Sequence, residues 1–246
     1  MNLINRTVEL YRTKNKVVTN AFNSVVANIC LQHERNDYKT FLLTGCEPWV
    51  GTTTMSMELA ISLSIAGWKT LLLDCDMRKD MEYKAKGSET NYGLVDYVRG
   101  IAKSEDIICP TNWEGLDYVS SGYMKNDDPL KMLYSHNLQV FIKKRSQEYD
   151  YIIMDVPSIN ASVDSLILSV KADATILVAA LDGQNKKYLE NARKKLIKEG
   201  ANVIGVIQNK VDVKEYRKYT KDYDYHLKKQ YLINHNRNSK NNQGRQ

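Results

Sequence analysis

Carboxylate side chains follow two apolar runs of this sequence, at positions where they could bind a metal ion or accept a proton. Asp74 and Asp76 come directly after the apolar residues 71–73. Asp155 ends a second apolar run, and Pro157 soon after it turns the chain away. An Asp at the end of a buried strand holds Mg²⁺ in phosphate-loop NTPases, usually through water. An Asp after a strand is also a common helix N-cap, so that structural role stays open for Asp74 and Asp76.

A third segment, residues 44–54, is built like a phosphate-binding loop. In such loops backbone N–H groups surround phosphates, a lysine reaches the β and γ oxygens, and a hydroxyl binds Mg²⁺. Gly51 and Thr53 fit this pattern, whereas Thr52 occupies the lysine position and Cys46 that of the first glycine. The bulky Trp49 indicates an altered loop backbone, a lid over the ligand, or simple packing on the rim. The candidate ligand-binding residues of the loop are Pro48, Trp49, Val50, Gly51, Thr52, Thr53 and Thr54.

The segments around these residues alternate between short apolar runs and stretches of helical length. Residues 39–43 before the loop read as a buried strand, and Met55, Leu59 and Leu63 behind it recur at helical spacing. Further strands are expected at 69–74, 116–120, 151–155, 174–178 and 203–207, with helices near 130–147, 161–171 and 186–199. This alternation predicts an α/β fold, a doubly wound, mostly parallel sheet with helices on both faces. The loop, Asp74 and Asp155 would then meet at the carboxyl ends of the strands.

The chain of 246 residues is expected to have three parts. Residues 1–38 form an N-terminal helical segment, residues 39–212 form the phosphate-loop domain, and residues 213–246 form a basic, tyrosine-rich tail that is partly disordered. The net charge is +6, and residues 214–246 alone carry nine Lys or Arg against three acids. A basic tail can meet nucleic acid or an anionic membrane surface, or it can simply be solvated.

Composition narrows the class of protein. A hydrophobic content of 43% with 26% charged residues is ordinary for a globular chain, and no run approaches the roughly 18 apolar residues of a membrane span. Arg6, Glu9 and Arg12 stand where a signal peptide would be apolar, so we expect a cytoplasmic protein. The four cysteines and four histidines are dispersed, which predicts reduced thiols and no zinc site.

Three motifs taken in order resemble a known family. They are E-P-W-V-G-T-T-T at residues 47–54, L-L-L-D-C-D-M-R at residues 71–78, and Y-D-Y-I-I-M-D-V-P at residues 149–157. In this order they resemble the bacterial tyrosine kinases of capsule and exopolysaccharide synthesis, CpsD/CapB-like P-loop ATPases related to partitioning ATPases. The resemblance covers about residues 17–212 and includes G-V-I-Q-N at residues 205–209.

The resemblance implies ATP and Mg²⁺ as cofactors and a role for each matched residue. Thr53, Asp76 and Asp155 would hold the metal, while Asp74 would accept the proton of the incoming tyrosine. Arg78 and Asn209 would join the loop in binding the nucleotide, with Asn209 at the adenine. The family phosphorylates a C-terminal tyrosine cluster in trans, which here corresponds to Tyr216, Tyr219, Tyr223, Tyr225 and Tyr231.

Two places depart from the family. Thr52 stands where the family has the loop lysine, and losing one preorganised charge commonly costs roughly a few hundredfold in rate. Nucleotide binding could survive on backbone N–H groups and the helix N-terminus. The family's assembly motif, E-x-x-R-x-x-R, falls on Asn20, Asn23 and Val26, so the charges that would join subunits into a homo-oligomeric ring are absent.

These features leave three functions to compare. The leading one is an ATP-binding tyrosine kinase that regulates polysaccharide synthesis with a membrane-embedded activator or co-polymerase, which would recruit the cytoplasmic protein to the membrane. The second is a catalytically impaired, nucleotide-binding regulator or interaction module of the same family. The third is a partitioning-type ATPase that works on a membrane or nucleic acid. That class needs an early loop lysine, which Glu47 and Pro48 do not supply, so no nucleic acid partner is expected.

Overall fold

The computed structural model describes residues 7–77, 92–122, 124, 128–180 and 186–212. Two compact units make up the chain, Met1–Asn209 and Lys210–Gln246, and all the described helices and strands belong to the first. Arg78 and the tail tyrosines from Tyr216 to Tyr231 lie outside the described residues. Among the helices that are described, none is both long enough and apolar enough to cross a membrane.

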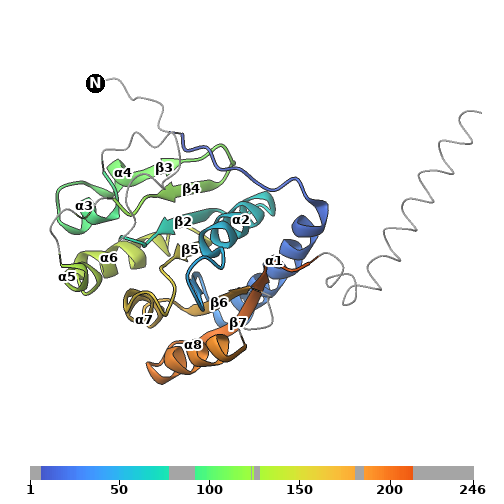
Figure 1. Ribbon diagram of the computed structural model, residues 1–246. Helices are drawn as coiled ribbons and strands as arrows, with labels where there is room; N and C mark the ends of the chain where they lie inside the picture. Colours follow the sequence, from blue (N-terminus) through green and yellow to red (C-terminus); the bar gives the residue numbers. More distant parts are fainter. Residues whose placement is uncertain (1–6, 78–91, 123, 125–127, 181–185, 213–246) are drawn as a thin grey trace, which may run out of the picture. The chain divides into compact units, whose positions relative to one another are not determined.

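A seven-stranded sheet forms the centre of the first unit (Figure 1). The strand order is β3-β4-β2-β5-β1-β6-β7, and β3 alone among these strands runs antiparallel to its neighbour. The predicted doubly wound, mostly parallel sheet is therefore confirmed. The strands are β1 Thr40–Gly45, β2 Thr70–Asp74, β3 Ile108–Pro110, β4 Leu116–Val119, β5 Tyr151–Asp155, β6 Ala174–Ala180 and β7 Val203–Asn209.

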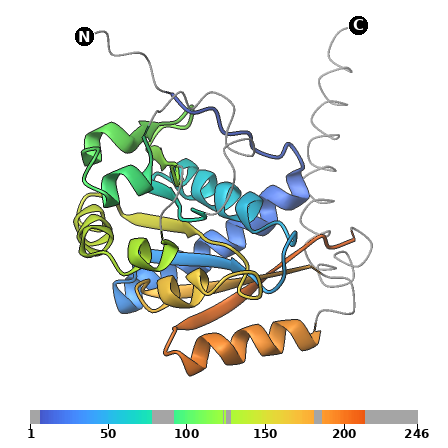
Figure 2. The ribbon, with the colours of Figure 1, turned by 60° about the vertical axis from the view of Figure 1, so that its left-hand side comes forward.

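Helices cover both faces of this sheet (Figures 1 and 2). Phe41 and Leu43 of β1 pack with residues of α1 and α2. Leu42 between them packs with residues of α3, α6 and α7 on the other face, as the two-residue period of a strand requires. The helices are α1 Lys16–Asn36, α2 Thr52–Ile65, α3 Leu94–Val98, α4 Ser104–Ile107, α5 Pro129–Leu133, α6 His136–Arg145, α7 Asp164–Ser169 and α8 Lys186–Lys198.

The expected helix at 130–147 is two helices in the structure. The chain leaves helical geometry after α5, and Ser135 caps α6 by accepting a hydrogen bond from the N–H of Asn137. A serine competes for backbone donors in this way and favours a new helix start over an uninterrupted helix. The segment between residues 94 and 110 also contains α3, α4 and β3, which were not expected.

Residues 7–15 form an extended arm before α1 that packs on the edge of the sheet (Figure 1). Val8 is fully buried and forms a parallel bridge with Thr111, beside β3. The indole N–H of Trp113 donates to the carbonyl of Leu10 at 2.9 Å. The arm thereby pairs backbone groups at an exposed sheet edge, which would otherwise invite association with another chain.

Candidate functional site

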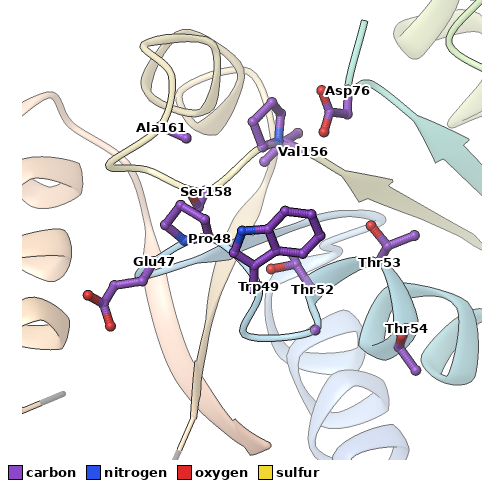
Figure 3. Close-up of a pocket in the computed structure, with 12 residues that line it drawn as sticks. Glu47, Pro48, Trp49, Thr52, Thr53, Thr54, Asp76, Val156, Ser158 and Ala161 are labelled. Atoms are coloured by element: carbon purple, nitrogen blue, oxygen red, sulfur yellow. The ribbon is translucent and has the colours of Figure 1, made fainter. Parts of the chain in front are cut away.

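A cavity of about 440 Å³ lies at the carboxyl ends of the parallel strands (Figure 3). Three segments meet there: the loop after β1, the turn after β2 and the loop after β5. Its lining residues are Glu47, Pro48, Trp49, Gly51, Thr52, Thr53, Thr54, Asp76, Val156, Pro157, Ser158 and Ala161. The sheet thus brings together seven predicted site residues, while Val50, Asp74, Asp155 and Asn209 lie outside the lining set.

The phosphate-like loop connects β1 to α2 and ends on Gly51, the N-cap of α2, at φ 91°. Helix α2 begins at Thr52, and its first turn carries no acidic side chain. The first N–H groups of a helix have no partner within the helix, and the helix dipole favours an anion beside them. Thr52, Thr53 and Thr54 all line the cavity, so the start of α2 presents a site that suits phosphate.

Asn209 contacts this loop at Val50 and Gly51. It is the last residue of β7, and its amide Nδ2 donates to the carbonyl of Val50 at 2.8 Å. A Cβ atom added to Gly51 would collide with the same amide nitrogen. Gly51 is therefore required twice, by its left-handed backbone and by the close approach of Asn209.

We expect Gly51→Ala to destabilise the protein and to weaken nucleotide binding more than Gly67→Ala. Gly67 has a similar φ of 94°, but no atom lies within 4 Å of a Cβ added there. The Gly67→Ala variant therefore measures the free-energy cost of a left-handed alanine without a steric clash. That cost is about 1–2 kcal/mol for a single left-handed residue. Thermal unfolding and titration with a fluorescent ATP analogue would measure both effects. Equal behaviour of the two variants would contradict a role for the Gly51–Asn209 contact.

The carboxylates sit at the ends of two paired strands. Asp74 and Asp155 are register partners on β2 and β5, and the Cys75 N–H donates to the Asp155 carbonyl at 2.8 Å. The Asp76 N–H donates to Oδ1 of Asp74 at 2.9 Å. Ser56 Oγ donates to Oδ1 of Asp155 at 3.1 Å. All three carboxylates are buried, and Asp76 lines the cavity whereas Asp74 and Asp155 do not.

Burial, together with these nearby carboxylates, keeps two neighbouring groups neutral. Burial, followed by the charges of Asp74, Asp155 and Asp76, raises the pKa of the Cys75 thiol well above its usual value. Burial, the charges of Asp74 and Asp155, and a hydrogen bond to Asp74 raise the pKa of Tyr118 likewise. The Tyr118 hydroxyl therefore stays protonated at neutral pH and donates a hydrogen bond to the Asp74 carboxylate.

The donor set fits Mg²⁺ bound with a nucleotide. Within residues 7–77, 92–122, 124, 128–180 and 186–212, no group of three or more His, Cys, Asp or Glu could hold a metal ion by itself. Mg²⁺ usually binds through one or two carboxylates, water and substrate phosphates, so it does not need such a cage. The Thr53 hydroxyl and the Asp76 carboxylate line the same cavity, beside the helix start that suits phosphate.

Several site residues were not expected from the sequence. Ser56 is one turn beyond Thr52, and this spacing on a helix was the signal that could have indicated it. Val156, Pro157, Ser158 and Ala161 form the wall opposite the loop. Tertiary hydrogen bonds attach this wall to the end of β1: Thr44 Oγ1 donates to the Pro157 carbonyl at 2.8 Å, the Ile159 N–H to the Gly45 carbonyl at 2.9 Å, and Asn160 Nδ2 to the Cys46 carbonyl at 2.7 Å.

The fold and the site together define a nucleoside-triphosphatase type of α/β domain, and residues 45–191 match the AAA domain family. Tyrosine-protein kinase CpsD of Streptococcus pneumoniae serotype 4 is 34% identical to this chain over 211 residues, which are 84% of this chain and 92% of that protein. This chain belongs to the same family, the bacterial tyrosine-protein kinases. The resemblance noted in the sequence is confirmed.

Solved structures agree with this assignment. The BceF tyrosine kinase domain has a TM-score of 0.73 and 25% identity to this chain, and the match covers 84% of each chain. The septum site-determining protein MinD from Pyrococcus horikoshii, solved in complex with Mg-ADP, has a TM-score of 0.56 and 22% identity over 69% of each chain. The second likeness shows a shared fold only.

Proposed function

We propose that this protein binds Mg-ATP and acts as a protein-tyrosine kinase that phosphorylates its own C-terminal tyrosines. One observation supports the proposal above all. A single cavity joins the N-terminus of α2 to the Asp76 carboxylate, in a chain that is 34% identical to tyrosine-protein kinases named CpsD. Phosphoryl transfer needs positioning and charge stabilisation more than covalent chemistry, and this arrangement offers both.

In this proposal the loop and the start of α2 bind the phosphates through the N–H groups of residues 51–54. Thr53 and Asp76 would hold Mg²⁺ at the cavity, and Asp155, which does not line it, would act through water. The chemistry that Mg²⁺ supplies is to neutralise charge on the phosphates. Asn209 would accept the adenine amino group at its oxygen, since its amide nitrogen already bonds Val50. Arg78, outside the described residues, would complete the nucleotide site.

Asp74 is the proposed proton acceptor for the incoming tyrosine. It does not line the cavity, and its Oδ1 accepts the backbone N–H of Asp76. Catalytic hydrogen bonds are often long or misaligned before substrates bind, so this geometry is compatible with the role.

The biological setting that we propose is capsular or exopolysaccharide synthesis. A protein named as a putative tyrosine-protein kinase in the cps region of Klebsiella pneumoniae is among the relatives, at 30% identity over 178 residues. A membrane-embedded activator would recruit this cytoplasmic protein to the membrane through its own cytosolic tail. Phosphates on the tail tyrosines would each add about −1.5 to −2 charges and could reverse the sign of the basic tail.

The second candidate is a nucleotide-binding regulator with little or no kinase activity. Thr52 favours it, because no hydroxyl can supply the positive charge of the loop lysine. None of the described residues that line the cavity is Lys or Arg. The retained carboxylates of Asp74, Asp76 and Asp155 favour the kinase instead.

One experiment separates the two candidates. The purified full-length protein is incubated with Mg-ATP, alone and with a cytosolic fragment of a membrane activator, and tail phosphotyrosine is measured by mass spectrometry. We expect phosphotyrosine that depends on the activator and is lost in Asp74→Ala. ATP binding without phosphotyrosine under either condition would leave the regulator, and no nucleotide binding at all would refute both.

A further inference from the structure

Trp49 is an unusual residue for the middle of a phosphate-binding loop. Its side chain is 85% exposed, and its backbone has φ 65°, in the left-handed region. For a bulky residue this conformation costs about 1–2 kcal/mol, and such strain collects at ligand-binding sites. An indole this exposed buries little apolar surface on folding, so we look for its role in what the cavity binds.

The cavity around Trp49 has more apolar wall than phosphate groups require. Pro48 adjoins the indole, and Val156, Pro157 and Ala161 belong to the loop after β5 (Figure 3). A phosphate needs N–H groups and cations, whereas proline rings and an indole suit a flat, apolar group. The cavity therefore has a polar part at the start of α2 and an apolar part at Trp49.

Trp49 and the proposed metal ligand Asp76 line the same cavity. Asn209, the proposed adenine contact, packs against Gly51 and Val50 and does not line the cavity. We take the apolar part of the cavity as the place of the acceptor because it shares this cavity with Asp76, whereas Asn209 does not line it.

We propose that Trp49 binds the phenol ring of the acceptor tyrosine and that Glu47 selects acceptors with a neighbouring Lys or Arg. This inference rests on the proposed kinase function and deepens it. Aromatic rings pair through offset or edge-to-face contacts, worth a factor of roughly two to ten in affinity. Glu47 is half-buried at the rim, and its carboxylate points away from the indole in Figure 3, where a flanking residue of a bound peptide would pass.

The charge of the cavity predicts which of the chain's own tail tyrosines it prefers. The described lining residues include two carboxylates, Glu47 and Asp76, and no basic group. Residues 214–220 surround Tyr216 and Tyr219 with three basic residues and one acid, whereas residues 221–226 surround Tyr223 and Tyr225 with one Lys and two Asp. The cavity should therefore prefer the first pair of tyrosines.

The test measures peptide binding, so that it does not depend on catalysis. Fluorescein-labelled peptides K-E-Y-R-K-Y-T and K-D-Y-D-Y-H are titrated into the full-length protein with a non-hydrolysable ATP analogue and Mg²⁺, and again without nucleotide. We expect the first peptide to bind more tightly than the second. Trp49→Gly should weaken its binding by roughly three- to tenfold, while Trp49→Phe should retain most of it. Glu47→Gln should weaken the basic peptide by up to about fivefold and reduce the preference between peptides.

Controls separate this inference from the proposed function. Trp68→Phe changes an indole outside the cavity and should leave peptide binding unaltered. The affinity for a fluorescent ATP analogue is measured for Trp49→Gly beside the wild type, because Trp49 is also a candidate nucleotide contact. The inference is overturned if neither peptide binds, if Trp49→Gly binds the peptide as the wild type does, or if Trp49→Gly loses nucleotide affinity instead, which would make Trp49 a nucleotide lid. None of these three outcomes excludes kinase activity, so the inference can fail while the proposed function stands. If the kinase assay fails instead, the titrations still show whether the cavity binds a tyrosine peptide.

Discussion

Replacing Thr52 with lysine is expected to raise the rate of tyrosine phosphorylation by about a hundredfold to a thousandfold. Thr52 is the first residue of α2 and lines the cavity. Its Oγ1 lies only 2.7 Å from where a Cβ on Gly45 would be, so the side chain packs back over the end of β1. A lysine from this position would reach further, toward the phosphates, and restore one preorganised charge, an effect of about 3–4 kcal/mol on the transition state.

The comparison needs a variant with the length of lysine and no charge. Thr52→Met supplies it, and we expect no gain in rate from Thr52→Met. Initial rates of phosphotyrosine formation at saturating Mg-ATP, together with the affinity for an ATP analogue, distinguish catalysis from binding. Equal rates for Thr52→Lys and Thr52→Met would show that charge is not what the loop lacks. An unchanged rate despite tight nucleotide binding would place the defect elsewhere in the site.

Arg12→Met is expected to lower the free energy of unfolding by about 2–4 kcal/mol. Arg12 belongs to the N-terminal arm, and its Nε lies 3.6 Å from Oε2 of Glu58 on α2, with side-chain exposures of 15% and 4%. Its Nη2 also donates to Ser62 at 3.2 Å. The N–H of Thr13 donates to Oε1 of the same Glu58. Without Arg12, α2 would hold a buried carboxylate with no opposite charge, which is more costly than the loss of the pair itself.

Thermal unfolding would show this effect as a fall in melting temperature of roughly 5–15 °C for a chain of this size. Arg99→Met is the matched control, because Arg99 forms a more exposed pair with Asp96 at 3.7 Å and should cost much less. The double variant Arg12→Met/Glu58→Met should recover part of the loss, since it removes the isolated charge. Similar melting temperatures for Arg12→Met and Arg99→Met would mean that the arm does not stabilise α2.

The fold was predictable because its strands are buried on both faces. The apolar runs at β1, β2, β5 and β6 have almost no polar interruptions, and such runs have few alternative structures. Short elements carry a weaker signal. The segment from α3 to β3 and the division between α5 and α6 depend on single caps and on packing, so the sequence pattern did not reveal them.

The candidate site was predictable in part, for a related reason. Gly51, Thr53, Asp76 and Asp155 were indicated because each follows a strand at a fixed offset, and parallel strands present their carboxyl ends at one edge. Ser56 was missed because a serine on a helix has many uses, and the wall from Val156 to Ala161 was missed because its mostly apolar residues carry no motif. Which carboxylate faces the cavity was also not evident, since that depends on the turn in which Asp74 accepts the N–H of Asp76.

The sequence by itself determined the order of strand, loop and helix, the family, and the missing charge at Thr52, because local periodicity and motif spacing are properties of the chain alone. The tertiary structure decided what surrounds that loop. It placed Asn209, which lies 158 positions later in the sequence, against Gly51. It also placed Arg12, from the arm before α1, against Glu58 of α2. It also left the Trp49 indole exposed at the cavity. Such contacts depend on how the elements pack in three dimensions, which no local pattern records.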